Sequence, residues 1–111
     1  MPDTSPHNFG YLSPFNLSNI DSIPDDIVGV YSIWYQRNLC IYIGSTTTQN
    51  IKLRLTQHWT HTHNDRLSRW ISAMGKELSF SYISTESKVA EDIEFCLIKR
   101  INPLTNVIRK N

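Results

Sequence analysis

Two triplets of glycine and tyrosine, on neighbouring apolar stretches, constrain the fold more than any other feature of this sequence. Gly29-Val30-Tyr31 is followed, eleven positions after its tyrosine, by the start of Tyr42-Ile43-Gly44. The stretches 28–35 and 39–44 are rich in β-branched and aromatic residues and flank a polar 36–38, which predicts a β-hairpin. Pairing Tyr31 with either Tyr42 or Gly44 would place both rings on one face, whereas a one-residue shift would separate them.

The residue types in these triplets suit phosphodiester chemistry. Glycine lets the backbone approach another group closely, and a tyrosine hydroxyl can donate a hydrogen bond or pass on a proton. Three further patterns follow along the chain: Arg54-x-x-x-His58, Glu94-x-x-Leu97-Ile98-Lys99 and Pro103-x-x-Asn106. Arginine, histidine and carboxylate side chains in one small chain, added to the two tyrosines, favour a nuclease.

Periodicity predicts an amphipathic helix directly after the hairpin. Ile51, Leu55 and Trp59 recur every four residues, so the helix is expected over 51–61. Its polar side is expected to carry one guanidinium and two imidazole groups: Arg54, His58 and His61. Ser45 to Asn50, which precede the helix, read as a polar loop.

The remaining elements are a short helix, a third strand and a long final helix. The short helix is expected over 67–74, where Gly75 stops it, and the strand over 78–84 with Phe80 and Tyr82 on one face. The final helix is expected from about 86 to 101. Asn102-Pro103 ends it, because proline disfavours helical geometry in the residue before it.

A single domain is the natural organisation of 111 residues, too few for a catalytic domain and a separate DNA-binding domain. Segment 1–27 is rich in Pro, Ser, Asn and Asp, which predicts an N-terminal arm strapped across a domain formed by 28–111. The formal net charge is +1, but residues 1–50 carry −3 and residues 51–111 carry +4. The second half can therefore present a basic face, although scattered solvated charges explain this about as well.

The sequence also indicates where the chain works. Cys40 and Cys96 are too few for a disulfide framework, and both lie in apolar stretches where a thiol acts as a small hydrophobic group. No stretch reaches the roughly 20 apolar residues that cross a bilayer, and the N-terminus lacks a signal-peptide pattern. We therefore expect a soluble cytoplasmic chain with no membrane partner.

Glu94 is the strongest single candidate for a catalytic group. At about 100° per helical residue, Ala90, Leu97, Ile98 and Ile101 fall around the same stripe, so its carboxylate lies on the apolar face of the final helix. A charge in that position is costly unless it is paired or bound to a cation. The alternative is a core arginine that pairs with the carboxylate.

Arg54 and His58 are one turn apart and share a face of their helix. The guanidinium fork of Arg54 can stabilise charge that develops on a phosphate, and His58 can relay a proton near neutral pH. The alternative is a solvated pair on a surface helix. Tyr31 and Tyr42, each taken alone, could likewise be ordinary strand aromatics.

In order and spacing, these motifs resemble the GIY-YIG nuclease superfamily from about Val28 to Ile108, with Val30 in place of the usual isoleucine. The resemblance implies an α/β (α+β) fold with a small three-stranded, mainly antiparallel sheet flanked by helices. It also implies a metal-dependent endonuclease that hydrolyses nucleic acid, with DNA the expected substrate, and leaves 5′-phosphate and 3′-hydroxyl ends. The positions that match its site are Tyr31, Tyr42, Arg54, His58, Glu94 and Asn106.

The resemblance gives these residues roles. Glu94 would hold a single divalent ion, and oxygen ligation with most positions left to water and phosphate suits Mg²⁺ or Mn²⁺. Tyr42 would orient water or phosphate, and the Asn106 amide would support a tyrosine or a backbone turn, although helix-stop punctuation also explains an asparagine there. A phenol has a pKa of about 10, so Tyr31 would need the metal or His58 to help activate the nucleophile. Which of the two is the base stays open.

Some candidate contacts and rival sites are less specific. The candidate nucleic-acid contacts are Gly44, Ser45, Lys52 and His61. The lysine found near the site in some branches of the family has no sure match here, because Leu53 precedes Arg54. A zinc site could form from His58, His61, His63 and a cysteine, but the spacing fits no common template. Three tryptophans could stack on unpaired bases or belong to the core: Trp34, Trp59 and Trp70.

Two other functions remain open from the sequence. One is a non-catalytic nucleic-acid-binding or interaction module that keeps the nuclease fold, since fold does not fix function. The other is a nuclease subunit whose target is chosen by a partner protein or by a second copy of the chain. The complete set of six matching site residues counts against a decayed, inactive module.

Overall fold

The β-hairpin that carries both triplets is the centre of the fold. In the computed structural model, which describes residues 9–106, β2 (Gly29–Tyr35) pairs antiparallel with β3 (Leu39–Thr46). Tyr31 pairs with Gly44, which is one of the two registers that the sequence allowed. The rings of Tyr31 and Tyr42 consequently lie on the same face, with their centroids 6.1 Å apart. The hairpin prediction is confirmed.

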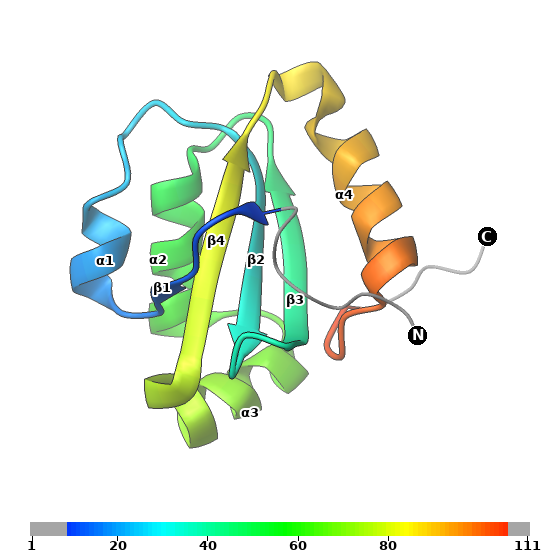
Figure 1. The fold of residues 1–111 in the computed structure, drawn as a ribbon. Coiled ribbons are helices and arrows are strands. Elements are labelled where there is room, and N and C mark those ends of the chain that lie inside the picture. The colour runs from blue at the N-terminus through cyan, green and yellow to red at the C-terminus, as the bar shows by residue number, and fades with distance from the viewer. Residues whose placement is uncertain (1–8, 107–111) are drawn as a thin grey trace.

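The sheet has four strands rather than the three expected, in the order β1-β4-β2-β3, and every pair is antiparallel. β4 (Leu78–Ser84) lies beside β2, and β1 (Ser13–Pro14) pairs with β4 at one edge (Figure 1). The extra strand comes from the expected N-terminal arm. A strand of two residues is too short to show the alternation of apolar and polar residues from which strands are predicted. This strand therefore depends on how the arm packs against β4.

Apolar residues hold the arm against the domain. Phe9, Leu12 and Phe15 are all buried, and the Ser81 hydroxyl donates a hydrogen bond to the Phe9 carbonyl oxygen. Residues 1–8 of the arm lie outside the described residues, as does Ile108, the expected end of the resemblance.

The helices lie close to their expected positions: α1 (Leu17–Asp21), α2 (Ile51–His61), α3 (Asp65–Met74) and α4 (Ser87–Ile101), with a 3₁₀ turn over Gly75–Glu77. α3 begins two residues before its expected start because Asn64 caps it, accepting a hydrogen bond from the Leu67 N–H at 3.0 Å. α4 ends where Asn102 adopts a left-handed conformation, with φ of 55°, directly before Pro103.

Helices cover both faces of the sheet (Figure 1). Tyr31, Ile33 and Leu55 belong to the core between the sheet and α2, whereas Val30 and Leu97 belong to the core beneath α4. Neighbouring residues of β2 therefore point into different cores, as the pleat of a strand requires. A site built around Tyr31 consequently opens on the α2 side of the sheet.

The tryptophans and cysteines are placed by the same two cores. Trp34 is fully buried, and Trp59 packs edge-on against Phe15 with ring centroids 5.3 Å apart. Cys40 is buried as expected, but Cys96 is exposed, since its position on α4 turns away from the sheet. Within residues 9–106, no helix has the length and apolar character needed to cross a membrane.

The glycine of each triplet is required by a close approach. Gly29 has φ of 150°, and a side-chain carbon there would overlap the Ile83 carbonyl oxygen. A side-chain carbon on Gly44 would overlap the phenol end of Tyr31, whose ring lies directly over this backbone. The second glycine therefore makes room for the first tyrosine.

We predict that Gly44→Ala lowers the free energy of unfolding by about 1–3 kcal/mol, because the added methyl group needs space that the buried Tyr31 ring fills. Gly75→Ala is the matched control. Gly75 has φ of −51°, and an added methyl group would meet only the Trp59 ring, at 3.8 Å. This variant should be as stable as the parent or slightly more stable. Urea unfolding of the two variants measures the difference, and equal stabilities would contradict the packing described above.

Candidate active site

A hydrogen bond between Tyr31 and His58 lies at the centre of the candidate site. Tyr31 Oη and His58 Nε2 are 2.7 Å apart, and the two side chains are only 1% and 4% exposed. The expectation that His58 lies on the polar side of α2 is wrong. Ile51, Leu55 and His58 are the buried residues of this helix, and their spacing of four and then three residues already describes one helical stripe.

Burial keeps both partners of this hydrogen bond uncharged. It lowers the pKa of His58 to about 4, and the positive charge of Arg54 acts in the same direction. Burial also raises the pKa of Tyr31 well above its usual value; the negative charge that Tyr42 carries when ionised adds to this rise, and the positive charge of Arg54 opposes it. At neutral pH, therefore, a neutral phenol meets a neutral imidazole, which has one nitrogen free to accept a proton.

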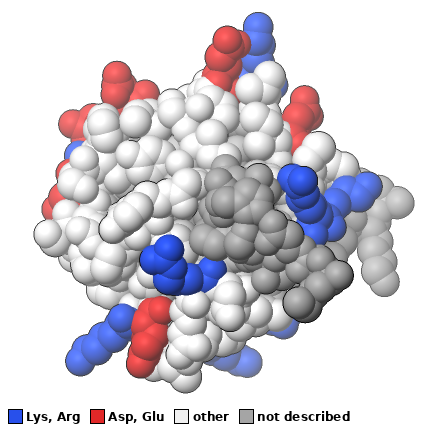
Figure 2. All heavy atoms as spheres, viewed as in Figure 1, with Lys and Arg blue, Asp and Glu red and all other residues white. Residues whose placement is uncertain are grey.

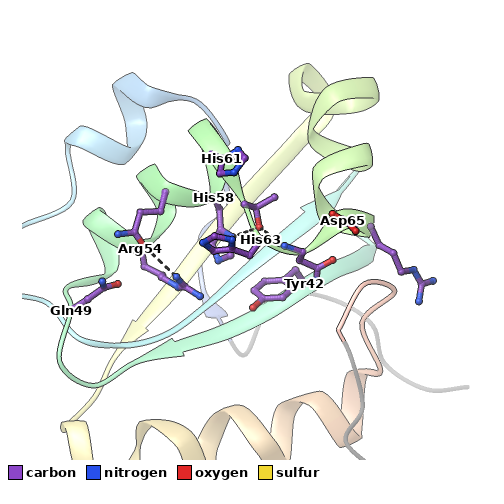
Figure 3. Close-up of a pocket in the computed structure, with 11 residues that line it drawn as sticks. Tyr42, Gln49, Arg54, His58, His61, His63 and Asp65 are labelled. Carbon is purple, nitrogen blue, oxygen red and sulfur yellow. Dashed lines mark hydrogen bonds between the residues drawn. The ribbon is translucent and has the colours of Figure 1, made fainter.

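An open pocket of about 870 Å³ lies beside the pair. In Figure 3, the side chains of Arg54, His58 and Tyr42 point into the space between α2 and β3. The Arg54 guanidinium donates a hydrogen bond to Gln57 Oε1 at 3.2 Å. Burial raises the pKa of Tyr42, while the charge of Arg54 lowers it. The pocket thus brings a fixed positive charge and a half-buried hydroxyl together beside the Tyr31–His58 pair.

The wall of this pocket continues past the catalytic candidates to the connection between α2 and α3. The residues that line it there, from the end of α2 to the first turn of α3, are His61, Thr62, His63, Asn64, Asp65 and Arg66. Of the expected nucleic-acid contacts, only His61 lies in this pocket, where its ring is exposed. Lys52 instead forms an ion pair with Asp25 at 2.7 Å.

Glu94 approaches from the other layer of the molecule. α4 packs against β3 and β2 on the face opposite α2, and Glu94 Oε1 accepts a hydrogen bond from Ser45 Oγ at 2.5 Å. Burial raises the pKa of Glu94, and the bond from Ser45 opposes the rise. Among residues 9–106 no arginine forms an ion pair with this carboxylate, so a core arginine in that range is not its partner.

The Glu94 carboxylate lies within electrostatic reach of Tyr31 and Tyr42, although its hydrogen bond goes to Ser45. Burial is the main cause of their raised pKa values, and the negative charge of Glu94 adds to the rise in both. Gly44 and Ser45, which are adjacent in β3, link the α2 layer of the site to the α4 layer. Gly44 lies under Tyr31 on the α2 side, and Ser45, the next residue of β3, contacts Glu94 on the α4 side.

Asn106 holds the strand that carries the second triplet. Its Oδ1 accepts a hydrogen bond from the Ile43 N–H at 2.9 Å, and its Nδ2 donates to the Ile43 carbonyl oxygen at 2.8 Å. Ile43 lies between Tyr42 and Gly44 on the outer edge of β3. The amide therefore supports the backbone of a strand rather than a tyrosine side chain, and it acts by positioning that strand.

The zinc alternative finds no support in the described part of the chain. Both ring nitrogens of His58 already have partners, Tyr31 and Thr62. No cluster of three or more His, Cys, Asp or Glu side chains suited to a metal ion occurs within residues 9–106. A metal ion bound within residues 9–106 would therefore have at most two His, Cys, Asp or Glu side chains as ligands.

Charge alone does not mark a nucleic-acid surface on the face seen in Figure 2. Lys, Arg, Asp and Glu side chains are scattered over that face and along its outline, and the two signs are mixed. The Lys and Arg side chains drawn in blue on that face do not gather into one basic patch. The pocket in Figure 3, with Arg54 on its wall, is a more specific place for a phosphate.

An antiparallel sheet with glycine and tyrosine triplets on one hairpin, flanked by helices that supply arginine, histidine and glutamate, defines a class of small α+β nuclease domains. The model of the GIY-YIG catalytic domain matches residues 27–106. The chain therefore belongs to the GIY-YIG family, and the resemblance seen in the sequence is confirmed.

Solved structures of one relative support the same fold. The N-terminal GIY-YIG endonuclease domain of UvrC from Thermotoga maritima, bound to its catalytic magnesium ion, has a TM-score of 0.60 and 27% identity, over 81% of this chain and 93% of that chain. A tyrosine-to-phenylalanine mutant of that domain, bound to its catalytic divalent cation, has a TM-score of 0.61 and 25% identity, over 82% and 93%. A comparison with curated proteins gives no match.

The buried, neutral state of His58 predicts that stability depends on pH. The pKa of the imidazole is about 4 in the folded chain and about 6.5 when exposed. Between these values the unfolded chain binds more protons, so stability is lost as the pH falls through this window. From pH 7 to pH 5 we expect a loss of roughly 2 kcal/mol that His58→Gln does not show. Urea unfolding at both pH values measures it, and the exposed His61→Gln variant should keep the parent's dependence.

Proposed function

We propose that this chain is a divalent-metal-dependent endonuclease that hydrolyses DNA and leaves 5′-phosphate and 3′-hydroxyl ends. The observation that carries the proposal is the 2.7 Å hydrogen bond between Tyr31 and His58 beside the charge of Arg54. Apolar residues in the same two positions would stabilise the fold about as well as a buried neutral phenol and imidazole do. Next to a permanent cation in an open pocket, they suit proton transfer at a phosphate.

Glu94 and Ser45 fit a hard divalent cation. A carboxylate and a hydroxyl offer oxygen ligands, and burial of the carboxylate raises its pKa, a cost that a bound cation would remove. With Glu94 as the protein carboxylate, most ligand positions are left to water and phosphate oxygens, as Mg²⁺ prefers. When bound, the ion supplies charge neutralisation at the phosphate and at the leaving oxygen. The magnesium-bound domain from Thermotoga maritima supports this choice of metal.

The remaining residues manage the phosphate and the proton. A water oxygen forms a bond to phosphorus as the bond from phosphorus to the 3′ oxygen breaks in line with it. The guanidinium of Arg54 stabilises the charge on the phosphate oxygens in the transition state. Tyr42, which is half-buried and lines the pocket, orients the phosphate or the water.

Tyr31 and His58 act together as the base. The water passes its proton to the Tyr31 oxygen while the phenol passes its own proton to His58 Nε2, and the departing 3′ oxygen takes up a proton from solvent. A phenol with a raised pKa is a poor base alone, and His58 Nε2 lies 2.7 Å from its oxygen, close enough to take its proton. In this relay Tyr31 takes the proton of the water, and His58 takes the proton of Tyr31.

The decisive experiment incubates the purified chain with supercoiled plasmid, single-stranded DNA and RNA, each with Mg²⁺ or with EDTA. We predict cleavage with Mg²⁺ only, and loss of at least 100-fold in Glu94→Gln, whose amide keeps the shape but loses the charge that binds the cation. Asp92→Asn, two residues earlier on the exposed side of α4, is the matched control and should cleave like the parent. Normal cleavage by Glu94→Gln in saturating Mg²⁺ would refute the metal assignment, and binding without cleavage would favour the non-catalytic module.

Tyr31→Phe, His58→Gln and the double variant test whether the pair acts as one unit. Each single variant is expected to lower kcat by roughly 100-fold or more. The kcat of the double variant should be no lower than that of the less active single variant. Such non-additive losses are expected when two residues serve one proton transfer. Rates from single-turnover cleavage, with circular dichroism to check folding, give the comparison. Multiplicative losses would mean that the two side chains act independently.

A further inference from the structure

Thr62 contacts the side of His58 that faces away from Tyr31. His58 Nδ1 and Thr62 Oγ1 are 2.9 Å apart, while His58 Nε2 is 2.7 Å from Tyr31 Oη. The imidazole is therefore held between two hydroxyl groups. Because it is uncharged at neutral pH, only one of its nitrogens carries a proton, and the two hydroxyls decide which one.

The position of Thr62 does not depend on His58. Thr62 directly follows α2 in an extended conformation, and its Oγ1 accepts a hydrogen bond from the Asn64 N–H at 3.3 Å. Asn64 Nδ2 in turn donates to the Thr105 carbonyl oxygen at 2.8 Å, and the Thr105 N–H donates to the Ile41 carbonyl oxygen of β3 at 2.9 Å. This chain of hydrogen bonds ties the hydroxyl beside His58 to the edge of the sheet.

The surroundings of Tyr31 select one direction for its hydrogen bond. The phenol keeps its proton because burial raises its pKa. Among residues 9–106 the hydrogen bond of the Tyr31 hydroxyl is to His58 Nε2, and the neighbouring Arg54 has only N–H donors and cannot accept the proton. The positive charge of Arg54 also favours lone pairs of the phenol oxygen on its own side. The phenol proton is therefore directed to His58 Nε2, and the imidazole proton is left on Nδ1, facing Thr62.

We propose that Thr62 is a positioning residue that holds His58 in the Nδ1–H tautomer, so that Nε2 stays open to the proton of Tyr31. This inference rests on the proposed function, in which that proton moves during cleavage. In the opposite tautomer, the Nε2 proton would point at the phenol oxygen, and His58 could not receive a proton from Tyr31. The Thr62 hydroxyl favours the productive tautomer because it gives the buried Nδ1–H an acceptor.

The tautomer can be observed without any nuclease activity. Long-range proton–nitrogen NMR spectra of the ¹⁵N-labelled chain distinguish Nδ1–H from Nε2–H, and the His58→Gln variant assigns the signals of His58. We expect Nδ1–H in the parent and in Thr62→Ser, which keeps the hydroxyl, and a shift to Nε2–H in Thr62→Val. Thr56→Val is the matched control: its hydroxyl bonds to the Lys52 carbonyl oxygen of the same helix, so its loss should leave the tautomer unchanged.

Kinetics then test the consequence for catalysis. Thr62→Val should lower kcat by about 10-fold or more with KM within twofold of the parent, and Thr62→Ser should restore most of the rate. An Nε2–H signal in a parent chain that cleaves DNA would overturn the proposal, even if Thr62→Val failed to fold. Equal tautomers and rates in Thr62→Val and Thr56→Val would overturn it as well. A parent chain that shows Nδ1–H but never cleaves would instead overturn the proposed function and the catalytic role of Thr62 with it.

Discussion

The ring of Tyr31 lies directly over the backbone of Gly44, and the rest of the site depends on this contact. The ring occupies the space that any side chain at Gly44 would need, which explains the glycine in the second triplet. The same packing places the phenol oxygen over Gly44 and 2.7 Å from His58 Nε2. The hairpin register, the choice of glycine and the central hydrogen bond are thus consequences of one placement of one ring.

The pleat of β3 explains how two layers of the molecule contribute to one site. Gly44 lies on the α2 side under Tyr31, while Ser45, the next residue, lies on the α4 side and bonds to Glu94. Asn106 fixes both backbone groups of Ile43, immediately before this point. The strand is therefore anchored directly before Gly44, which faces the pocket, and Ser45, which faces the Glu94 carboxylate. The charges of Arg54 and Glu94 act on Tyr31 and Tyr42 from opposite sides of the sheet.

Local patterns in the sequence predicted those parts of the site that a single element defines. The hairpin, the bounds of α2 and β4, and the half-buried place of Glu94 on α4 follow from periodicities of two and 3.6 residues. Residue polarity alone predicts His58 on the wrong side of α2, whereas its spacing from Ile51 and Leu55 matches the buried stripe in which it lies. In a buried stripe a histidine is stable only with partners for both nitrogens. The family resemblance brought Tyr31 and His58 together, but nothing in the sequence indicated Thr62 as the second partner.

The sequence by itself determined the family, the elements and the residue types available for chemistry, since these depend on local spacing and on motifs. Tertiary structure alone decided the fourth strand, the ion pair that occupies Lys52, and the hydrogen bonds that join Ile43 to Asn106 and His58 to Thr62. Most of these contacts join residues far apart in the chain, whose distance and direction depend on how the layers pack. The protonation of His58 is set in the same way, because the burial that keeps it neutral exists only after the sheet and helices have come together.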